Sequence, residues 1–349
     1  MALTIVETAT VTGGVDTHAD AHVAAALNHI GGLLGTQSFP TTPAGYARLL
    51  SWLQSLGPVA LVGVEGTGSY GAGLTRHLVA AGVKVVEVDR SDRQARYRSG
   101  KSDPLDAESA ARAALSGKAK GAPRGRDNTV EAIRALMVAK RSARGERTRS
   151  INQARSLVVT GPDDLRARFE RHSTDSLPAE LAGLRPRPGD TVGYATRIAL
   201  RELGRRAEFL ADQIDYLDQL LLPLIELQAP SLLETYGIGP HVAAILIIAA
   251  GDHPDRLRSE AAWAHLCGAA PIPAGSGKTT GRYRLNPGGD RQANHALWRI
   301  VFSRMGHHLP TQAYVERRLK EGKTKPEIIR CLKRFVAREV YHHLLWTPD

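Results

Sequence analysis

The chain has 349 residues, 42% of them hydrophobic, and carries a formal net charge of +11. This length and apolar content suffice for about two or three domains with buried cores, which excludes a globally disordered chain. The excess of positive charge favours a polyanionic partner, most simply nucleic acid.

The cysteine content excludes two further classes of protein. Cys267 and Cys331 are the only cysteines, so they form neither a disulfide framework nor a Cys-x-x-Cys metal motif. The first residues do not have the basic and apolar regions of a secretion signal, and no run of about 18 apolar residues predicts a membrane span. We therefore expect a soluble cytoplasmic protein that is not exported. The abundance of Ala, Gly and Arg suggests a high-GC bacterial genome, and in a bacterium the positive charge would associate the protein with the nucleoid.

Residues 10–116 alternate between strand-like and helix-like segments. Strands are predicted at 23–27 and 33–39, followed by a helix at 43–56. A strand at 59–64, a helix at 69–81 and a strand at 83–88 come next in the chain. Early adjacent strands followed by alternating helices and strands predict an α/β domain with a mixed sheet, the order of a ribonuclease-H-like fold.

Four acidic residues in this region stand where metal ligands are expected. Asp16 lies in an apolar run, Glu65 closes the apolar run 59–65, and Asp103 and Asp106 are three positions apart. A carboxylate at the end of a buried strand is costly unless a cation meets it, and residues three apart share one face of a helix. If the four carboxylates converge, a divalent cation is needed to offset their repulsion, and oxygen ligands favour Mg²⁺ or Mn²⁺. In a basic protein this pattern predicts two-metal chemistry on a phosphodiester.

The segment from Asp16 to His22 has an acidic or imidazole side chain at every second position. Such a spacing could line one face of a strand with metal ligands. We interpret His18, Asp20 and His22 instead as the end of a strand followed by a polar turn.

An NAD-binding enzyme is an alternative function. Gly66, Gly68 and Gly71 form a Gly-x-Gly-x-x-Gly motif between a predicted strand and helix, and Glu87 follows about 20 residues later, as in dinucleotide-binding turns. Two features count against this alternative. Glu65 would face a pyrophosphate with like charge, and the usual motif opens its domain, whereas here three strands and a helix precede it.

The middle of the chain is predicted to be helical. Basic, glycine-rich residues 117–126 predict a linker, a helix is expected at 128–159, and residues 160–190 are expected to be partly irregular. A coiled-coil seam follows, in which apolar residues alternate at spacings of three and four: Leu200, Leu203, Ala207, Leu210, Ile214, Leu217, Leu221 and Leu224. We expect this helix to end at Pro223. The seam either packs on helix 128–159 or pairs with another protomer, and the sequence leaves both open.

A third region begins at about residue 231. Gly237-Ile238-Gly239 resembles the turn of a helix-hairpin-helix element, in which the second helix presents backbone N–H groups to a phosphate. The last helix, predicted at 326–345, is amphipathic with a cationic outer face.

Residues 272–279 resemble a phosphate-binding loop. Ile272 stands where that loop needs glycine, however, and Pro271 and Pro273 disfavour the preceding strand. Ser276 lies between two glycines and has cationic residues nearby in the sequence, namely Lys278, Arg282, Arg284 and Arg291. Ser276 is therefore a candidate nucleophile for phosphorus, with a surface loop as the alternative.

Together these motifs resemble the IS110 family of insertion-sequence transposases. The segments 15–18, 64–70 and 101–107, which contain the four acidic residues, are similar to the family's four-acidic-residue signature. The segments 236–240, 274–282 and 285–294 are similar to its C-terminal transposase domain. Asp290 departs from the family pattern, which often has Asn at that position.

The resemblance implies a fold and a division into three parts. Residues 1–122 would form a RuvC-like domain that holds Mg²⁺ or Mn²⁺ through its four acidic residues. Residues 123–230 would form a helical, coiled-coil region, and residues 231–349 a mostly α-helical transposase domain.

The resemblance also implies an activity and partners. Ser276 would form a covalent link to DNA, and a structured guide RNA from the mobile element would pair with donor and target DNA. We expect a transposase that cuts and rejoins DNA strands through a phosphoserine intermediate, as a dimer or tetramer. A metal-dependent, junction-resolving nuclease without that intermediate is the alternative.

Overall fold

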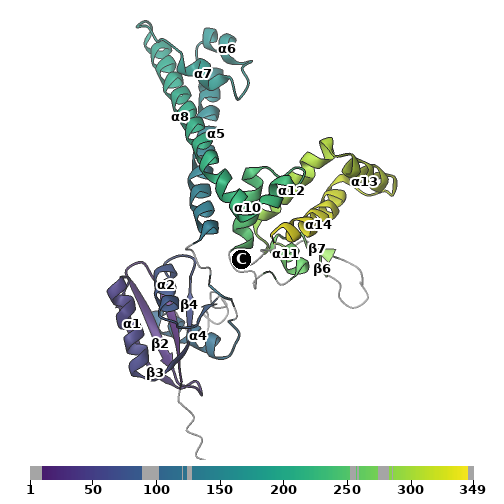
Figure 1. The fold of residues 1–349 in the computed structure, drawn as a ribbon. Coiled ribbons are helices and arrows are strands. Elements are labelled where there is room, and N and C mark those ends of the chain that lie inside the picture. Colours follow the sequence, from purple (N-terminus) through teal and green to yellow (C-terminus); the bar gives the residue numbers. More distant parts are fainter. Residues whose placement is uncertain are drawn as a thin grey trace, which may run out of the picture. The chain divides into compact units, whose positions relative to one another are not determined.

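The computed structural model describes residues 10–88, 102–119, 121–123, 128–251, 257, 259–273, 283–284 and 286–344. The chain forms two compact units, shown in Figure 1: an amino-terminal unit of residues 1–126 with 252–256, and a carboxy-terminal unit of residues 127–251 with 257–349. The predicted boundary after residue 230 stays a prediction. Ser276 lies outside the described residues.

A five-stranded mixed sheet forms the centre of the amino-terminal unit. Its strands are β1 (Val11–Thr17), β2 (Ala21–Leu27), β3 (Leu33–Pro40), β4 (Val59–Glu65) and β5 (Val85–Val88). Their order is β3-β2-β1-β4-β5. β1 and β3 pair antiparallel with β2, whereas β4 is parallel to β1 and β5. This arrangement confirms the predicted α/β domain with a ribonuclease-H-like sheet.

Helices cover both faces of this sheet. They are α1 (Pro43–Ser55), α2 (Ala72–Ala80) and α4 (Asp103–Leu115). α1 begins where Thr42 accepts a hydrogen bond from the Gly45 N–H, and its buried Leu49 and Leu53 join the core on one face. α4 covers the other face. It lies so close to β1 that a Cβ atom on Gly14 would be 2.4 Å from the Ala107 carbonyl oxygen.

The glycine motif at residues 66–71 forms a turn, so α2 begins at Ala72 rather than at the predicted residue 69. Gly66 has φ of +67°, a conformation that favours glycine. The motif follows a strand in the middle of a sheet with antiparallel members, unlike the doubly wound parallel sheet of dinucleotide-binding domains. Glu87, which that alternative requires, accepts a hydrogen bond of 2.7 Å from Thr67.

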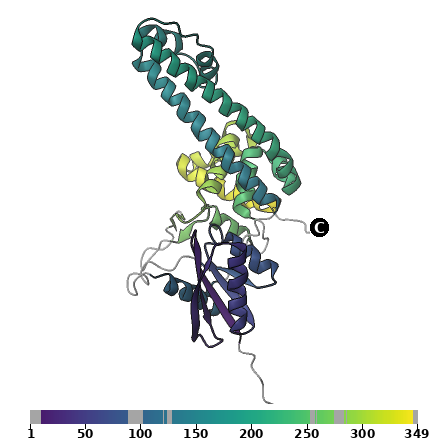
Figure 2. The ribbon, with the colours of Figure 1, turned by 90° about the vertical axis from the view of Figure 1, so that its left-hand side faces the viewer.

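A long helical hairpin opens the carboxy-terminal unit. α5 (Thr129–Thr160) and α8 (Thr191–Gln228) lie side by side in Figures 1 and 2, with α6 (Asp163–Phe169) and α7 (Leu177–Ala182) between them in sequence. Leu200 and Ala207 share a core with Ile151 near the end of α5, whereas Leu221 shares a core with Ile133 near its start. The two helices are therefore antiparallel, and the coiled-coil seam packs within the chain.

The expectation that the helix ends at Pro223 is wrong. α8 continues through Pro223 to Gln228. Proline removes one backbone hydrogen bond, but Leu221 and Ile225 on either side are fully buried in the core shared with α5 and the following helices. Their burial stabilises the additional turn.

The rest of the carboxy-terminal unit is mostly helical, as expected. Its elements are α9 (Pro230–Glu234), α10 (Pro240–Ala250), α11 (Glu260–Leu266), α12 (Arg291–His307), α13 (Leu309–Lys320), α14 (Lys325–Leu344) and the short strands β6 (Ile272–Pro273) and β7 (Tyr283–Arg284). α10 lies at the centre, since seven of its residues, among them Leu246, are buried. Among the described helices, none has the length and apolar character needed to cross a membrane.

Candidate metal centre

The carboxyl ends of β1 and β4 bring Asp16 and Glu65 together. In the parallel pairing of these strands Val15 lies opposite Val64, so the next residue of each strand is Asp16 and Glu65 respectively. Because side chains alternate along a strand, Asp16 points to the same face as Gly14, and Glu65 to the same face as Gly63.

That face is the one covered by α4. A Cβ atom on Gly14 would lie 2.0 Å from the Ala111 nitrogen, and a Cβ atom on Gly63 would lie 2.8 Å from the Ala110 carbonyl oxygen. These glycines let the helix backbone lie directly on the sheet. Asp16 and Glu65, two residues further along their strands, therefore point into the layer between sheet and helix.

The first turn of α4 supplies the other two carboxylates. The buried face of the helix consists of alanines, among them Ala107 and Ala110. Asp103 and Asp106 each lie four positions earlier, so they continue the same face toward the start of the helix. Carboxylates in a first turn are stabilised by the partial positive charge of the helix N-terminus. We call Asp16, Glu65, Asp103 and Asp106 the acidic quartet.

His18 joins this site by direct contact. Its Nε2 lies 3.0 Å from Oδ2 of Asp16 and 3.6 Å from Oδ1 of Asp103. One ligand atom from each of these three residues lies within 4.8 Å of the other two. The Asp16 side chain is 11% exposed, whereas those of His18 and Asp103 are 45% and 49% exposed, so the cluster opens to solvent on one side.

The structure thus brings Asp16 and Asp103 together, and it adds a residue that the sequence pattern assigned to a polar turn. His18 does follow the end of β1, but its ring turns back onto the two carboxylates. The sequence feature that indicates His18 as a ligand is the run of acidic and imidazole side chains at every second position from Asp16. Glu65 and Asp106 face the same layer. Among the described residues, their carboxylate oxygens do not belong to the group of ligand atoms that lie within 4.8 Å of one another.

Hydrogen bonds hold the two strand ends in place. The Thr17 hydroxyl donates to the backbone carbonyl of Glu65 over 2.8 Å, and the Thr41 hydroxyl donates to the carbonyl of His18 over 3.1 Å. These bonds connect β1 to β4 and the turn after β1 to the end of β3. The positions of Asp16, His18 and Glu65 are therefore fixed by neighbouring backbone.

His22, at the start of β2, has a structural role. It is fully buried, and its ring stacks on Tyr46 at 5.7 Å. Burial, and to a smaller extent the nearby His18, lowers the pKa of His22 to about 4. The ring is therefore neutral at physiological pH. The assignment of His22 to a polar turn is wrong, because this residue is a buried member of β2.

The cluster fits a divalent cation. Two carboxylates and an imidazole are ligands that Mn²⁺ accepts, and the carboxylate oxygens also suit Mg²⁺. Beside them is a cavity of about 490 Å³ lined by His18, Asp20, Ser38, Tyr70 and Asp103, among others. The described lining contains neither Lys nor Arg. A phosphate anion would be repelled by the aspartates there unless a cation were bound.

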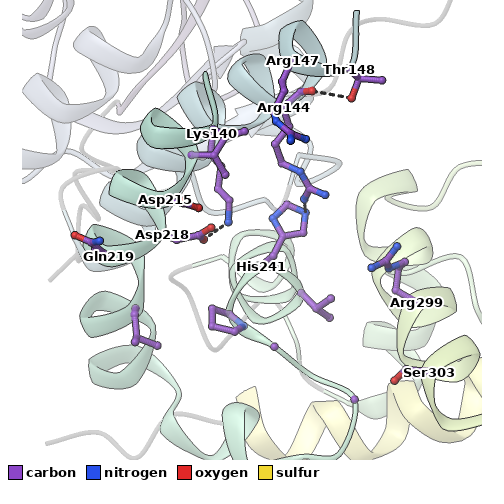
Figure 3. A pocket seen from close by; sticks show the side chains of 17 residues that line it. Lys140, Arg144, Arg147, Thr148, Asp215, Asp218, Gln219, His241, Arg299 and Ser303 are labelled. Atoms are coloured by element: carbon purple, nitrogen blue, oxygen red, sulfur yellow. Dashed lines mark hydrogen bonds and ion pairs between the residues drawn. The ribbon is translucent and has the colours of Figure 1, made fainter. Parts of the chain in front are cut away.

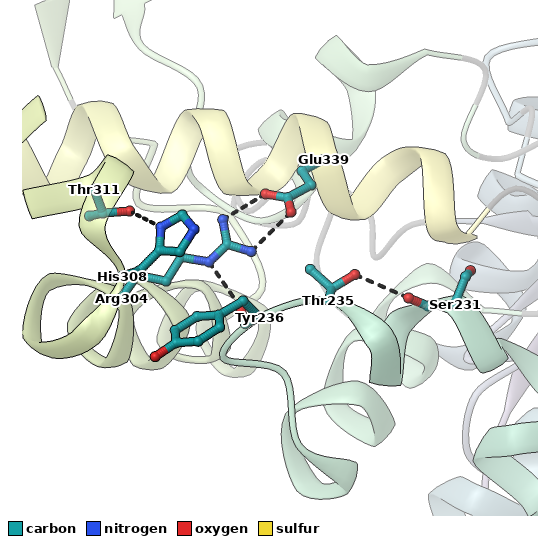
Figure 4. A network of polar contacts seen from close by, with 7 residues as sticks. All are labelled: Ser231, Thr235, Tyr236, Arg304, His308, Thr311 and Glu339. Atoms are coloured by element: carbon teal, nitrogen blue, oxygen red, sulfur yellow. Dashed lines mark hydrogen bonds and ion pairs between the residues drawn. The ribbon is translucent and has the colours of Figure 1, made fainter. Parts of the chain in front are cut away.

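A second feature lies in the carboxy-terminal unit, at the Gly-Ile-Gly turn between α9 and α10. Gly237 has φ of +82°, and Ile238 is buried in the core. Arg304 of α12 donates from Nε to the carbonyl of Tyr236 over 2.9 Å and makes a two-pronged ion pair with Glu339 of α14, as Figure 4 shows. The turn is therefore tied to two later helices.

Two family models match the chain. A model of IS110-type DEDD proteins, described as a transposase, matches residues 13–160, which contain the whole acidic quartet. A model described as the transposase IS116/IS110/IS902 family matches residues 229–316, which contain the Gly-Ile-Gly turn and position 276. A search of curated proteins finds no match.

Proposed function

Because the chain belongs to the IS110 family of transposases, which are DNA strand-transfer enzymes, we propose that the acidic quartet is its metal-dependent catalytic site. One observation carries this proposal: two strand ends and the first turn of α4 direct their carboxylates into one layer, where Asp16 and Asp103 meet at His18. The family model that matches residues 13–160 covers all of these positions.

Asp16 and Asp103 would hold the divalent cation, with Glu65 and Asp106 beside them and His18 as an additional ligand or as a group that orients the two aspartates. When bound, Mg²⁺ or Mn²⁺ supplies Lewis-acid polarisation of the scissile phosphate and offsets the negative charge that develops there. The protein supplies the positions of the carboxylates, which the strand ends and the helix start fix before substrate binds.

Ser276 is the proposed nucleophile. Its Oγ would attack the scissile phosphorus and form a P–O bond, while the bond from phosphorus to the DNA 3′ oxygen breaks. The serine proton passes to a base and the departing 3′ oxygen takes up a proton, so the products are a phosphoserine and a free 3′ hydroxyl. Since the phosphodiester energy is retained in the covalent link, strands can be rejoined without ATP. Support comes from the sequence pattern and from the family match across position 276.

DNA binding follows from the family. A transposase binds DNA, and we propose that donor and target DNA are selected by pairing with a structured guide RNA of the mobile element. The net charge of +11 suits contact with both nucleic acids. Two further expectations stay predictions. They are the three-part division of the chain at residues 122 and 230 and the location in the cytoplasm beside the nucleoid.

We propose a dimer or tetramer, because α8 has a second apolar stripe besides the seam buried within the chain. Phe209, Tyr216, Leu220 and Leu227 are exposed and follow one another at spacings of seven, four and seven. This is the repeat of a coiled-coil seam. An exposed stripe of large apolar side chains favours burial against another helix, and a second copy of α8 offers the same stripe.

Strand transfer on cognate DNA tests the catalytic proposal. We expect Asp103→Ala to abolish both cutting and joining, and Ser276→Ala to abolish both as well. If Ser276→Ala still cut DNA at the normal rate, water would be the nucleophile and the alternative of a junction-resolving nuclease would hold. If Asp103→Ala transferred strands as well as the wild type, the acidic quartet would not be the catalytic site.

A further inference from the structure

A basic cleft lies in the carboxy-terminal unit, whereas the acidic quartet belongs to the amino-terminal unit, and the cleft has no part in the catalytic proposal. It has a volume of about 990 Å³ and is drawn in Figure 3. Its walls come from α5, α8, α12 and the Gly-Ile-Gly turn with the start of α10. The cationic residues that line it are Lys140, Arg144, Arg147 and Arg299.

The positive charges lie on separate walls. Arg144 and Arg147 come from α5, whereas Arg299 comes from α12 on another side of the cleft (Figure 3). Neither Arg147 nor Arg299 forms an ion pair with any described residue, and the Nε atom of Arg147 is buried without a hydrogen-bond partner. Two guanidinium groups are thus available to an anion.

The carboxylates of the cleft do not cancel this charge. Asp218 is paired with Lys140, whose side chain is buried, so these two charges compensate each other. Asp215 is the other acidic residue of the described lining, which also contains three arginines. The cleft therefore keeps an excess of positive charge.

Two neutral features also line the cleft, the N-terminus of α10 and His241. No side chain caps the N-terminus of α10, which begins directly after Gly239 in the lining. An uncapped helix N-terminus favours a phosphate. Arg144 can only donate, so its contact of 3.1 Å makes Nε2 of His241 an acceptor and leaves the ring proton on Nδ1. His241 thereby orients Arg144 across the cleft.

We propose that this cleft binds the sugar–phosphate backbone of duplex DNA. The inference rests on the proposed function, since a transposase must hold its DNA. A duplex is favoured over a single strand because none of the described residues that line the cleft is Phe, Tyr or Trp, and single-strand sites usually stack bases on such rings. The guanidinium groups lie on separate walls, and the helix N-terminus also lines the cleft. This arrangement suits contacts to phosphates, which do not depend on the base sequence.

Binding measurements on the full-length protein test this proposal. A blunt DNA duplex and a single-stranded RNA of the same sequence are titrated by fluorescence anisotropy over a range of salt concentrations, in EDTA. The variants are Arg147→Gln and Arg299→Gln, which remove no ion pair within the described residues. The control is Arg171→Gln, an arginine after α6 whose side chain is 92% exposed and lies outside the cleft. Circular dichroism spectra identical to the wild type exclude misfolding.

We expect each cleft variant to bind the duplex about tenfold more weakly at 0.1 M salt, with the magnitude of the log–log salt slope reduced by about 0.9. The loss for RNA should be smaller, and Arg171→Gln should match the wild type. Duplex binding equal to that of Arg171→Gln would overturn the proposal, and so would a loss for RNA that equals or exceeds the loss for the duplex.

The test is independent of the metal site, because binding is measured without divalent metal. Asp16→Ala should bind duplex DNA like the wild type and still fail in strand transfer. If Arg299→Gln bound the duplex normally and Asp16→Ala were inactive, the proposal for the cleft would be refuted and the proposal for the metal site would stand. If Arg299→Gln bound the duplex weakly and Asp16→Ala were fully active, the proposal for the metal site would be refuted and the proposal for the cleft would stand.

Discussion

His18 shows how a single side chain can connect parts of a site that are distant in sequence. Its ring lies between Asp16 of the same strand end and Asp103 of α4. A neutral imidazole can ligate a cation through one nitrogen, and a protonated imidazole can neutralise part of the carboxylate charge. Either role makes the two aspartates less costly to hold together.

Arg304 has the corresponding role in the carboxy-terminal unit, where it ties the Gly-Ile-Gly turn to α14. Its side chain is 10% exposed, whereas that of Glu339 is 41% exposed. We predict that Arg304→Met lowers the free energy of unfolding by about 2 kcal/mol, less than for a fully buried pair because Glu339 is partly solvated. Calorimetry of the full-length protein measures the midpoint of the affected transition.

A matched control comes from the same unit. Arg317 and Glu321 form an exposed pair at 3.9 Å, so Arg317→Met should leave the midpoint nearly unchanged. If Arg304→Met and Arg317→Met had the same small effect, the contact between Arg304, Tyr236 and Glu339 would not stabilise the turn.

The pKa of His241 gives a prediction about pH. Burial, together with the charges of Arg144 and Lys140, lowers this pKa from 6.5 to about 4. Because the folded protein takes up the proton less readily than the unfolded chain, this residue's contribution to stability is fully present above pH 6.5 and is lost as pH falls toward 4. An NMR titration of the histidine rings, assigned with His241→Gln, should find that this ring has a pKa near 4. A His241 pKa near its ordinary value would show that the ring is solvated.

At the scale of elements, the close contact of α4 with the sheet positions the carboxylates. We predict that Gly14→Ala destabilises the protein by several kcal/mol and weakens Mn²⁺ binding, because the added Cβ would meet backbone atoms of Ala107 and Ala111 and push the helix away. Chemical denaturation and calorimetric titration with Mn²⁺ measure the two effects.

Gly145→Ala in α5 is the control for this substitution. No atom of the described residues lies within 4 Å of its added Cβ, so the change should stabilise the helix by about 0.5–1 kcal/mol and leave Mn²⁺ binding unaltered. Normal stability and normal Mn²⁺ affinity in Gly14→Ala would mean that the contact between α4 and β1 does not hold the site together.

Much of the sheet could be predicted from the sequence because strands such as β2 and β4 are apolar runs bounded by turn residues. The segments 23–27 and 59–64 correspond closely to β2 and β4. The continuation of α8 beyond Pro223 could not be predicted, because it depends on the burial of Ile225 among residues from distant segments. Local pattern describes strands and helices, whereas tertiary contacts decide where they end.

The same limit applies to the site. Asp16 and Glu65 could be proposed as metal ligands because a carboxylate at the end of an apolar run is unusual by itself. His18 could not be distinguished from an ordinary turn residue, because its partner Asp103 is far away in the sequence. Ser276 lies outside the described residues, and its assignment stays a prediction.

At the scale of the whole molecule, the proposed dimer or tetramer depends on the exposed apolar stripe of α8. We predict that the wild type is an oligomer in solution and that Phe209→Glu combined with Tyr216→Glu is a monomer, because like charges would replace the apolar stripe. Light scattering coupled to size-exclusion chromatography measures the mass in solution. Val138→Glu combined with Val159→Glu, on exposed positions of α5, is the control and should leave the mass unchanged. An unchanged mass in the α8 variant would refute this interface.

The central claim is that the carboxylates of the amino-terminal unit hold a divalent cation. Anomalous diffraction at the manganese edge, from crystals of the full-length protein grown with Mn²⁺, tests it most directly. We predict a peak about 2.0–2.4 Å from carboxylate oxygens of Asp16 and Asp103, and its loss in Asp16→Ala. A well-ordered site with no peak between these two side chains, or manganese bound only elsewhere in the chain, would contradict the account.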